Sequence, residues 1–567
     1  MRPVRSLRVG PTGVVSERRR DGTILLRSAS PAPAYPAKIT ERLDYWAAQA
    51  PERVLFAQRG ESGWRTITYR QARARVRAVA ASLLKRKLSP ERPLAVLSGN
   101  DLEHALLMLA ALYVGVPYAP VSPAYSLVSS DFAQLRRVMD LVTPGLVYAC
   151  DEARFGGALN AAAPRDAGVL FAADFPGLEK GEDRAVDEAH ARVGPDSIAK
   201  FLFTSGSTGA PKAVINTQRM WCANQAMVRE VLAFVQDEPP VMVDWAPWHH
   251  TAGGNKDFGL ILYNGGTLYI DEGKPLPGLI ETTVRNLREV ASNWYFTVPK
   301  GYEMLLPYLR DDAALRKTFF ARLKGLWFAG AGVSQHVFEA YKDLAYETCG
   351  EQILFMTGFG STETAPHTLS RTWDTADASN MGVPAPGAEL KLVPFQDKYE
   401  LRLKGPHVTP GYWRQPELSA QAFDEEGYYR LGDAFVFADE ANPEAGLLFR
   451  GRISEDFKLS TGTWVHVGPL RAKFMEHFGP MVRDVVIAGE NRPDLAALVF
   501  PAPGFSAEEF DRKFTSLAST GSSNRIARYA IMKEPPSLDA GEMTDKGTLN
   551  QKAVLRRRAQ IVEDLYR

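Results

Sequence analysis

The sequence predicts an α/β protein in which a large N-terminal domain is followed by a smaller α+β C-terminal domain. Up to about residue 450, strand-like runs alternate with runs of helical periodicity, the element order of α/β folds. The chain has 567 residues, more than one hydrophobic core usually supports, and 45% of them are hydrophobic. After residue 450 the pattern changes to charged helices and short strands. We therefore expect a large domain over residues 39–450 and a small domain over residues 451–567.

The first 38 residues are expected to form an extension ahead of the large domain. They end in the Pro- and Ala-rich run Ser30–Pro36, which favours extended, weakly packed backbone. They are rich in arginine, but Gly10–Gly13 breaks any amphipathic helix and no apolar segment follows. This composition predicts neither a signal peptide nor a transit peptide.

The next elements follow from the spacing of hydrophobic residues. A helix is expected from Thr68 to Leu83, and Leu94–Leu97 has the composition of a buried strand. Apolar residues at helical spacing then predict a helix over Leu102–Tyr113, followed by a strand within Val116–Val121. The uncharged stretch that contains these two elements is interrupted by glycine and prolines, so we expect a buried helix and strand and no membrane span.

Later strand-like runs end in glycine-rich or polar turns. These runs are Leu326–Phe328 and Ile353–Met356, and two earlier apolar runs, Phe201–Phe203 and Ala213–Ile215, lie before and after another glycine-rich loop. Open α/β sheets bind their ligands beyond the carboxyl ends of the strands. The sequence therefore places the candidate site at these turns.

The charge balance and the cysteines exclude several classes of partner. The chain carries 67 Lys and Arg residues against 66 Asp and Glu residues, so no net field attracts nucleic acid or a membrane surface. Cys150, Cys222 and Cys349 have neither CxxC spacing nor a histidine cluster nearby, and they predict neither a disulfide framework nor a zinc site. We expect a cytoplasmic protein that acts on a small molecule as a monomer or homodimer.

The most informative segment is the loop Thr204–Pro211 with a lysine after it. Its glycines allow successive backbone amides to face one anion, and its hydroxyls add donors, so the loop predicts a phosphate site. It is not a Walker P-loop, because Pro211 precedes the lysine and Ala213 follows it. A solvated Gly/Ser linker is the alternative. The candidate phosphate-binding residues are Thr204, Ser205, Gly206, Ser207, Thr208, Gly209 and Lys212.

Four further motifs follow this loop in a fixed order. They are Pro247–Gly253, Met356–Glu363, Tyr429–Asp433 and Glu542–Asn550. Together with the loop they resemble the adenylate-forming superfamily, which comprises acyl-CoA synthetases, firefly-type luciferases and the adenylation domains of peptide synthetases. The resemblance runs from about Thr68 to the C-terminus. It implies a large α/β domain of adenylate-forming type and a small, mobile C-terminal domain.

The second of these motifs, Met356–Glu363, is similar to the family's aromatic-Gly-x-Thr-Glu motif. The resemblance implies that Thr362 contacts the α-phosphate of ATP and that Glu363 holds Mg²⁺. A carboxylate beside a triphosphate is repelled unless a cation lies between them, which also points to Mg²⁺. Without the other motifs, a solvated acidic loop is the alternative.

The third motif, Tyr429–Asp433, is similar to the family's Tyr-x-x-Gly-Asp motif. It implies that Asp433 accepts hydrogen bonds from the ribose hydroxyls, and a neutral diol suits an acceptor-only carboxylate. By the same resemblance, Arg452 makes a second ribose contact, and Gly332 in Ala329–Ser334 lies beside the adenine. Taken alone, Asp433 is more typical of a turn or a helix cap.

The first motif, Pro247–Gly253, is similar to the family's Pro-x-Phe-His-x-x-Gly motif. This similarity aligns His250 with the histidine that lines the acyl pocket near the reacting carboxylate. Trp245 and Trp248, together with the two histidines, suit an aromatic acid. A histidine among aromatic residues is more often a packed core residue, so both interpretations stay open here.

The last motif, Glu542–Asn550, occupies the place of the family's C-terminal lysine motif and aligns Lys546 with the catalytic lysine. An anionic carboxylate must approach an anionic α-phosphate, and an ammonium group between them stabilises the charge that develops. Lys552 is the alternative, and an exposed lysine is ordinarily a solvated surface charge. The resemblance thus gives Lys546, Thr362, Glu363 and His250 as the catalytic residues.

The activity that the resemblance implies has two half-reactions. The acid and Mg-ATP form an acyl-adenylate, and coenzyme A then takes the acyl group and releases AMP. In the family the small domain rotates between the two steps about a residue that corresponds to Ser454, where Asp or Lys is common. We expect the hinge near residues 452–455, since a small residue can also absorb the backbone change.

A second departure from the family pattern lies in Gly462–Leu470, which lacks the usual glutamate and carries Gly468 and Pro469. This stretch, the lysine motif and Gly451–Lys458 are most similar to the feruloyl-CoA synthases, which implies ferulate and related hydroxycinnamic acids as substrates. The alternatives are another aryl- or fatty-acyl-CoA synthetase, an enzyme that loads a carrier protein, or an inactive nucleotide-binding relative. Because no carrier-like module follows Arg567, free CoA is the expected acceptor.

Overall fold

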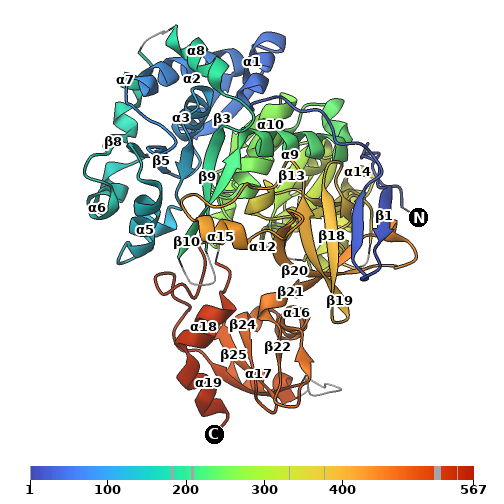
Figure 1. The fold of residues 1–567 in the computed structure, drawn as a ribbon. Helices are drawn as coiled ribbons and strands as arrows, with labels where there is room; N and C mark the ends of the chain where they lie inside the picture. The colour runs from blue at the N-terminus through green and yellow to red at the C-terminus, as the bar shows by residue number, and fades with distance from the viewer. Residues whose placement is uncertain are drawn as a thin grey trace.

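The structure is a computed structural model that describes residues 2–180, 184–205, 210–330, 332–375, 377–515, 525–545 and 547–567, without the side chains of Ser205 and Pro480. Figure 1 shows a large domain built from the N-terminal and central parts of the chain, and below it a small domain, coloured orange to red, that ends at the C-terminus. The predicted α/β fold with a separate C-terminal domain is confirmed.

A six-stranded sheet carries the predicted phosphate loop at one edge. Its order is β10-β9-β6-β5-β7-β8, and its strands are parallel except where β9 pairs with β10. The strands are β5 (Leu94–Leu97), β6 (Tyr118–Pro120), β7 (Leu146–Ala149), β8 (Gly168–Phe171), β9 (Ile198–Ser205) and β10 (Pro211–Thr217). The strands predicted on both sides of the loop are therefore confirmed.

Two further sheets of the large domain meet edge to edge. Their orders are β11-β12-β3-β4 and β13-β14-β15-β16-β17. At the junction the Val241 N–H donates to Asn293 Oδ1 at 2.7 Å, and the Asn293 N–H donates to the Val241 carbonyl at 3.2 Å. The strands are β3 (Val54–Gly60), β4 (Gly63–Thr68), β11 (Val241–Asp244), β12 (Thr267–Ile270), β13 (Trp294–Thr297), β14 (Gly325–Phe328), β15 (Leu354–Phe359), β16 (Leu369–Arg371) and β17 (Val383–Pro384).

The N-terminal segment is built into an antiparallel sheet of the large domain. Its order is β1-β2-β18-β19-β20-β21, so a hairpin from the first 38 residues extends strands from the end of the domain. Ser30–Pro36 has no regular secondary structure, as expected, but Ile24 and Leu26 before it are buried. The sequence did not predict this hairpin. The strands are β1 (Val14–Arg18), β2 (Ile24–Ser28), β18 (Glu389–Phe395), β19 (Lys398–Lys404), β20 (Tyr429–Phe437) and β21 (Leu447–Arg452).

Helices cover these sheets, and one of them lies in the core. The predicted helix Leu102–Tyr113 is α3, and all of its residues except Glu103 are buried. Asp101 caps α3, and Thr68 and Gln71 form a capping box at the start of its neighbour α2. The helices are α1 (Thr40–Gln49), α2 (Tyr69–Leu84), α3, α4 (Ala124–Leu127), α5 (Ala133–Val142), α6 (Glu152–Ala162), α7 (Phe175–Leu178), α8 (Ala185–Arg192), α9 (Gln218–Val231), α10 (Phe258–Asn264), α11 (Ile280–Glu289), α12 (Pro299–Asp311), α13 (Ala313–Ala321), α14 (Gln335–Cys349) and α15 (Pro416–Gln421).

The small domain has its own sheet and its own aromatic core. The sheet β24-β25-β26 packs with a two-stranded ribbon, β22-β23, and four helices. Phe478 and Phe510 stack with ring centroids 4.3 Å apart in its core, and Phe474 packs beside them. The elements are β22 (Phe457–Lys458), β23 (Trp464–Val465), α16 (Val467–Phe478), β24 (Val482–Ala488), β25 (Leu495–Pro501), α17 (Ala507–Thr515), β26 (Ile526–Ile531), α18 (Gln551–Arg557) and α19 (Ala559–Leu565).

Candidate active site

The phosphate loop joins two paired strands. Thr204 at the end of β9 lies opposite Lys212 at the start of β10, so the two strands hold both ends of the loop in register. The predicted residues Gly206, Ser207, Thr208 and Gly209 and the side chain of Ser205 lie outside the described residues. What the structure fixes is therefore the frame of the loop and the position of its lysine.

One tyrosine connects the lysine of this loop to the predicted magnesium ligand. The Lys212 ammonium lies 4.9 Å from the centre of the Tyr412 ring. The Tyr412 hydroxyl donates to Glu363 Oε1 at 3.2 Å and lies 3.0 Å from the Tyr429 hydroxyl. The structure thus brings Lys212 and Glu363 together through Tyr412. Sequence reasoning missed Tyr412, because nothing distinguishes it from a packing residue in a Gly-Tyr-Trp loop.

Glu363 and Thr362 occupy a short turn just beyond the carboxyl end of β15. Both side chains are buried, and the Thr409 N–H donates to the Glu363 carbonyl at 2.8 Å. Burial, followed by the charge of Glu363, raises the pKa of Tyr412 and of Tyr429. Both hydroxyls therefore stay protonated at neutral pH and remain able to donate hydrogen bonds to nearby oxygens.

Asp433 and Arg452 lie opposite each other on β20 and β21. The Arg452 Nε atom is 3.6 Å from Asp433 Oδ1, and the arginine side chain is 65% exposed while that of Asp433 is 6% exposed. Burial raises the pKa of Asp433 to about 7; Arg452 lowers it, and the charges of Glu455 and Glu363 raise it further. Gly332, the predicted adenine contact, lies exposed between β14 and α14.

The last two residues of the histidine motif begin a π-helical turn, Ala252–Asp257, a geometry that often marks functional sites. A Cβ atom at Gly254 would lie 2.2 Å from the Trp248 carbonyl oxygen, so only glycine fits there. The His250 N–H donates to the Pro247 carbonyl, and its Nδ1 accepts from the Ala252 N–H at 3.4 Å.

Trp245 and Trp248, at the histidine motif, make different kinds of contact. Trp245 is partly buried and donates its Nε1–H to Thr297 Oγ1 at 3.2 Å. Trp248 is 1% exposed, and its ring packs edge-on against His104 and Phe258 in the main core. Contacts of this kind are those of a packing residue, so for Trp248 the core role accounts for the aromatic side chain.

The lysine-motif loop is closed at its base. Met543 pairs with Leu549, and the Asn550 N–H donates to the Glu542 carbonyl at 2.9 Å. The buried Glu542 carboxylate accepts from Arg558 at 2.7 and 3.0 Å and from Arg557 at 2.8 Å. The predicted catalytic residue Lys546 lies outside the described residues. Its alternative Lys552 is exposed on α18.

The same loop touches the histidine motif of the large domain. His249 Nε2 lies 3.4 Å from Asp545 Oδ2, and the two side chains are 16% and 15% exposed. Asp539 accepts hydrogen bonds from the Ser130 hydroxyl at 2.8 Å and from its N–H at 3.1 Å. Sequence reasoning aligned His250 and passed over its neighbour, although the doubled histidine was the one visible signal.

A glycine contact lies where the chain passes between the domains. Gly451, near the end of β21, has a φ of +88°, and a Cβ atom at Gly468 would lie 2.9 Å from the Gly451 Cα. So close an approach requires glycine at both positions. The departure at Gly468 therefore has a structural reason. Ser454 lies exposed in the turn Ile453–Glu455, and its role as a hinge stays a prediction.

Family models match both parts of the chain. Residues 43–413 match the AMP-binding enzyme model, and residues 456–567 match the AMP-binding enzyme C-terminal domain. The chain belongs to the AMP-binding enzyme family. This confirms the resemblance to the adenylate-forming superfamily that the motifs predicted.

Curated relatives of this AMP-binding enzyme differ in what their names describe. A carboxylic acid reductase from Segniliparus rugosus is 24% identical over 88% of this chain and 46% of its own length. An anthranilate–CoA ligase from Pseudomonas aeruginosa is 27% identical over 80% of this chain and 82% of its own. A feruloyl-CoA synthase from Amycolatopsis is 26% identical over 65% and 71%. The chain spans less than half the length of the reductases that it matches.

Solved structures share the fold of this AMP-binding enzyme. The adenylation domain of the Segniliparus rugosus carboxylic acid reductase, in complex with AMP and a carboxylic acid, superposes with a TM-score of 0.69 at 20% identity over 94% of each chain. The O-succinylbenzoate coenzyme A synthetase of Bacillus subtilis, in complex with AMP, gives 0.69 at 15% identity, over 91% of this chain and 97% of its own. These likenesses confirm the adenylate-forming fold.

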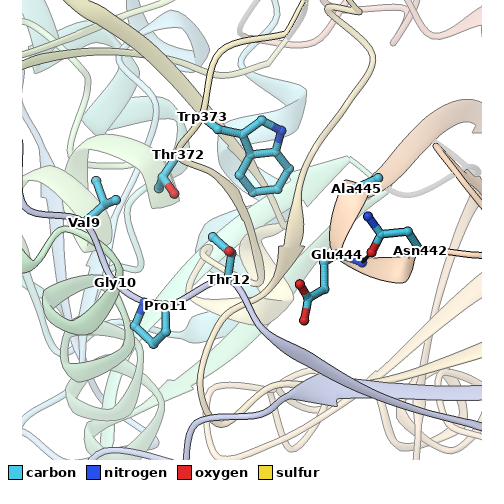
Figure 2. Close-up of a pocket in the computed structure, with 9 residues that line it drawn as sticks. All are labelled: Val9, Gly10, Pro11, Thr12, Thr372, Trp373, Asn442, Glu444 and Ala445. Carbon is cyan, nitrogen blue, oxygen red and sulfur yellow. Dashed lines mark hydrogen bonds between the residues drawn. The ribbon is translucent and has the colours of Figure 1, made fainter. Parts of the chain in front are cut away.

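A surface cavity of about 420 Å³ lies between the N-terminal segment and two loops of the large domain. Figure 2 shows the side chains that line it. The lining residues are Val9, Gly10, Pro11, Thr12, Thr372, Trp373, Asn442, Glu444 and Ala445. The predicted site residues that the structure describes are not among them, and we do not assign this cavity to the active site. In the described ranges, no helix combines the length and apolar character of a membrane span.

Proposed function

We propose that this AMP-binding enzyme is an ATP-dependent acid–CoA ligase, and that ferulate and related hydroxycinnamic acids are its substrates. The observation that carries the proposal is the meeting of two motifs from different domains, through Asp545 of the lysine loop and His249 of the histidine motif. A mere nucleotide-binding protein has no need to bring a second domain onto this motif. A ligase does, because two anions must react there.

The chain's own residues would divide the work of nucleotide binding. The strand frame of the β9–β10 loop would present its amides to the phosphates, and Lys212 would add a point charge beside them. Thr362 would donate to the α-phosphate. Tyr412 and Tyr429 would hold the Glu363 carboxylate in one orientation through their hydroxyls.

The residues around Glu363 fit a magnesium ion that is shared with the nucleotide. In the described part of the chain no group of three or more His, Cys, Asp or Glu side chains could hold a metal unaided. Mg²⁺ commonly binds through one or two carboxylates together with substrate phosphates, and Glu363 provides one such carboxylate. When bound, the ion would neutralise charge on the phosphates.

Asp433 would accept hydrogen bonds from the ribose hydroxyls, with Arg452 beside it. Because its pKa is about 7, the carboxylate that this role needs is half formed at neutral pH. The neighbouring Arg452 charge favours the ionised form. A bound diol would favour it as well, since only the carboxylate accepts from both hydroxyls.

The reaction would proceed in two displacements. An oxygen of the substrate carboxylate attacks the α-phosphorus, and the bond to pyrophosphate breaks. The thiol of coenzyme A then gives up its proton to water, its sulfur attacks the acyl carbon, and AMP leaves with the bonding electron pair. Lys546, carried over from the family motif, would stabilise the negative charge that gathers where the two anions meet.

The proposal that the substrates are hydroxycinnamic acids rests on sequence similarity to feruloyl-CoA synthases. It is supported by the Gly462–Leu470 stretch and by feruloyl-CoA synthases among the relatives. A second candidate is an enzyme that passes the acyl group to a carrier protein. It is favoured by carboxylic acid reductases at comparable identity, of which this chain spans less than half.

The deciding experiment supplies the purified protein with ATP, Mg²⁺, CoA and one acid at a time from a panel of cinnamic, benzoic and fatty acids. We expect ferulate to give AMP and a thioester that absorbs to the red of the free acid. Pyrophosphate release without CoA consumption would favour the carrier-loading enzyme. Absence of AMP with every acid of the panel would overturn the ligase proposal.

A further inference from the structure

The small domain meets the large domain near the active site through two aspartates that flank the start of the lysine motif. Asp539 accepts two hydrogen bonds from Ser130, at 2.8 and 3.1 Å. Asp545 pairs with His249 at 3.4 Å. In the chain, Lys546 directly follows Asp545. The contact with His249 is therefore made by the residue next to the predicted catalytic lysine.

The loop that bears these aspartates is firmly held within its own domain. Glu542 lies between Asp539 and Asp545, is buried, and is bound by Arg557 and Arg558. Because these arginines hold the loop to the rest of the small domain, its contacts with the large domain can fix the position of the whole loop. Movement of Asp545 relative to His249 then requires movement of the domain.

The part of the large domain that Asp545 contacts is also held firmly in place. His249 belongs to a turn whose neighbour Trp248 is locked in the core, and the Trp248 N–H donates to Asn100 Oδ1 at 3.0 Å. Tyr125 of α4 lies close enough to Asp545 for that charge, after burial, to raise its pKa. The Asp545 side chain is thus 15% exposed and lies near both Tyr125 of α4 and the histidine motif.

We infer that Asp545 and His249 are a positioning pair that docks the lysine motif for acyl-adenylate formation. The inference rests on the proposed ligase function. The two side chains are only 16% and 15% exposed, so water competes less for their contact than for a contact on the open surface. Such a contact holds one orientation and still separates when the domain turns for the second half-reaction.

The first test separates the two half-reactions in Asp545→Asn and His249→Gln variants. Adenylation is measured by acid-dependent exchange of pyrophosphate into ATP, and thioester formation from preformed acyl-adenylate with CoA. We expect adenylation to slow about fivefold in each variant, the upper end of the effect of losing one pairwise contact of a charged side chain. Thioester formation should stay within about twofold, because the pair is broken in that step.

Two further variants distinguish a specific pair from general damage. The double variant should be no slower than the slower single variant, since each change removes the same contact. The exchanged pair, His249→Asp with Asp545→His, should recover part of the lost adenylation rate. Asp564→Asn is the matched control, because Asp564 is an exposed aspartate on α19 of the same domain.

A crosslinking readout needs no acid substrate. Val128 on the large domain is 67% exposed, and Ala540 next to Asp539 is also exposed. With both replaced by cysteine, a short bifunctional maleimide should join the domains, and the yield should fall severalfold when Asp545→Asn is added. Each single-cysteine variant is the control for the native cysteines.

Three outcomes would overturn the positioning pair. They are unchanged adenylation in both single variants, equal losses in both half-reactions, and an unchanged crosslinking yield. Failure of the ligase proposal is distinguishable, because the parent protein would then show no pyrophosphate exchange with any acid. In that case the crosslinking yield still decides whether Asp545 docks the domain.

Discussion

The phosphate site and the lysine-motif loop are held in place in different ways. In the large domain, Tyr412, Glu363 and Tyr429 are linked through buried hydroxyls and a carboxylate, and Lys212 lies over the Tyr412 ring. The lysine loop is as firmly built within the small domain, by Glu542 and its two arginines. Among the described residues, its contacts with the large domain include those of Asp539 and Asp545, while a separate buried ion pair, Lys398 with Asp456, joins the domains close to where the chain crosses between them.

This difference indicates which part of the candidate site keeps its arrangement when the domains move. A buried network of hydrogen bonds is costly to open, because each group that it leaves unpaired loses its solvation as well. A few partly exposed polar contacts can exchange with water at little cost. We therefore propose that Lys212, Tyr412 and Glu363 are in place before the nucleotide binds, whereas the small domain brings the lysine motif to them.

The largest expected effect on the reaction rate comes from removing the positive charge of Lys546 on the small domain. Lys546→Ala should slow adenylation on the order of 10²- to 10³-fold, the usual loss for one preorganised charge contact. Thioester formation from preformed acyl-adenylate should be spared. Lys552→Ala is the matched control, a nearby exposed lysine of the same domain. Equal rates for Lys546→Ala and the parent, with a slow Lys552→Ala variant, would transfer the role to Lys552.

The next effect tests whether the loop is rigid within its own domain. Glu542→Gln leaves Arg558 buried without its counter-charge, so the small domain should lose about 3 kcal/mol of its free energy of unfolding. Urea unfolding followed by amide hydrogen exchange in β24 and β25 measures this loss. Glu563→Gln, on exposed α19, should change it by less than about 0.5 kcal/mol. An equal loss of free energy of unfolding in the two variants would mean that Glu542 does not hold the lysine loop within the small domain.

The smallest effect concerns the part of the candidate site that keeps its arrangement. Burial raises the pKa of Asp433 to about 7, so the carboxylate forms as the pH rises through that value. The affinity for AMP should therefore rise from pH 6 to pH 8, by up to about tenfold if only the ionised form binds. Calorimetric titration measures it. In Asp433→Asn the rise in AMP affinity with pH should vanish, since the amide does not titrate. An equal rise in the variant and the parent would contradict the role of Asp433 as a ribose contact.

Much of the frame was predictable from local patterns. The helix Leu102–Tyr113 and the strand Leu94–Leu97 have the bounds that hydrophobic spacing predicted, because both are fully buried and carry an uninterrupted apolar signal. The strands around the phosphate loop were also identified. The N-terminal hairpin was not, because its partner β18 lies more than 300 residues away in the chain.

The candidate site divides in the same manner. Glu363 and Asp433 belong to motifs whose order along the chain identifies them. Tyr412 belongs to none of the motifs, and His249 has only the doubled histidine as a signal. Each makes its contact with a residue that another part of the chain supplies. The Tyr412 hydroxyl donates to Glu363, and His249 meets Asp545 of the lysine loop.

The sequence by itself determined the family, the order of the motifs and the chemical type of each candidate residue, because these depend on residue identity and local spacing. Only the tertiary structure decided which side chains meet. Lys212 reaches Glu363 through Tyr412, Gly468 must be glycine because it touches Gly451, and Asp545 reaches His249 from the other domain. Such contacts depend on how sheets and domains pack over hundreds of residues, and no local pattern encodes them.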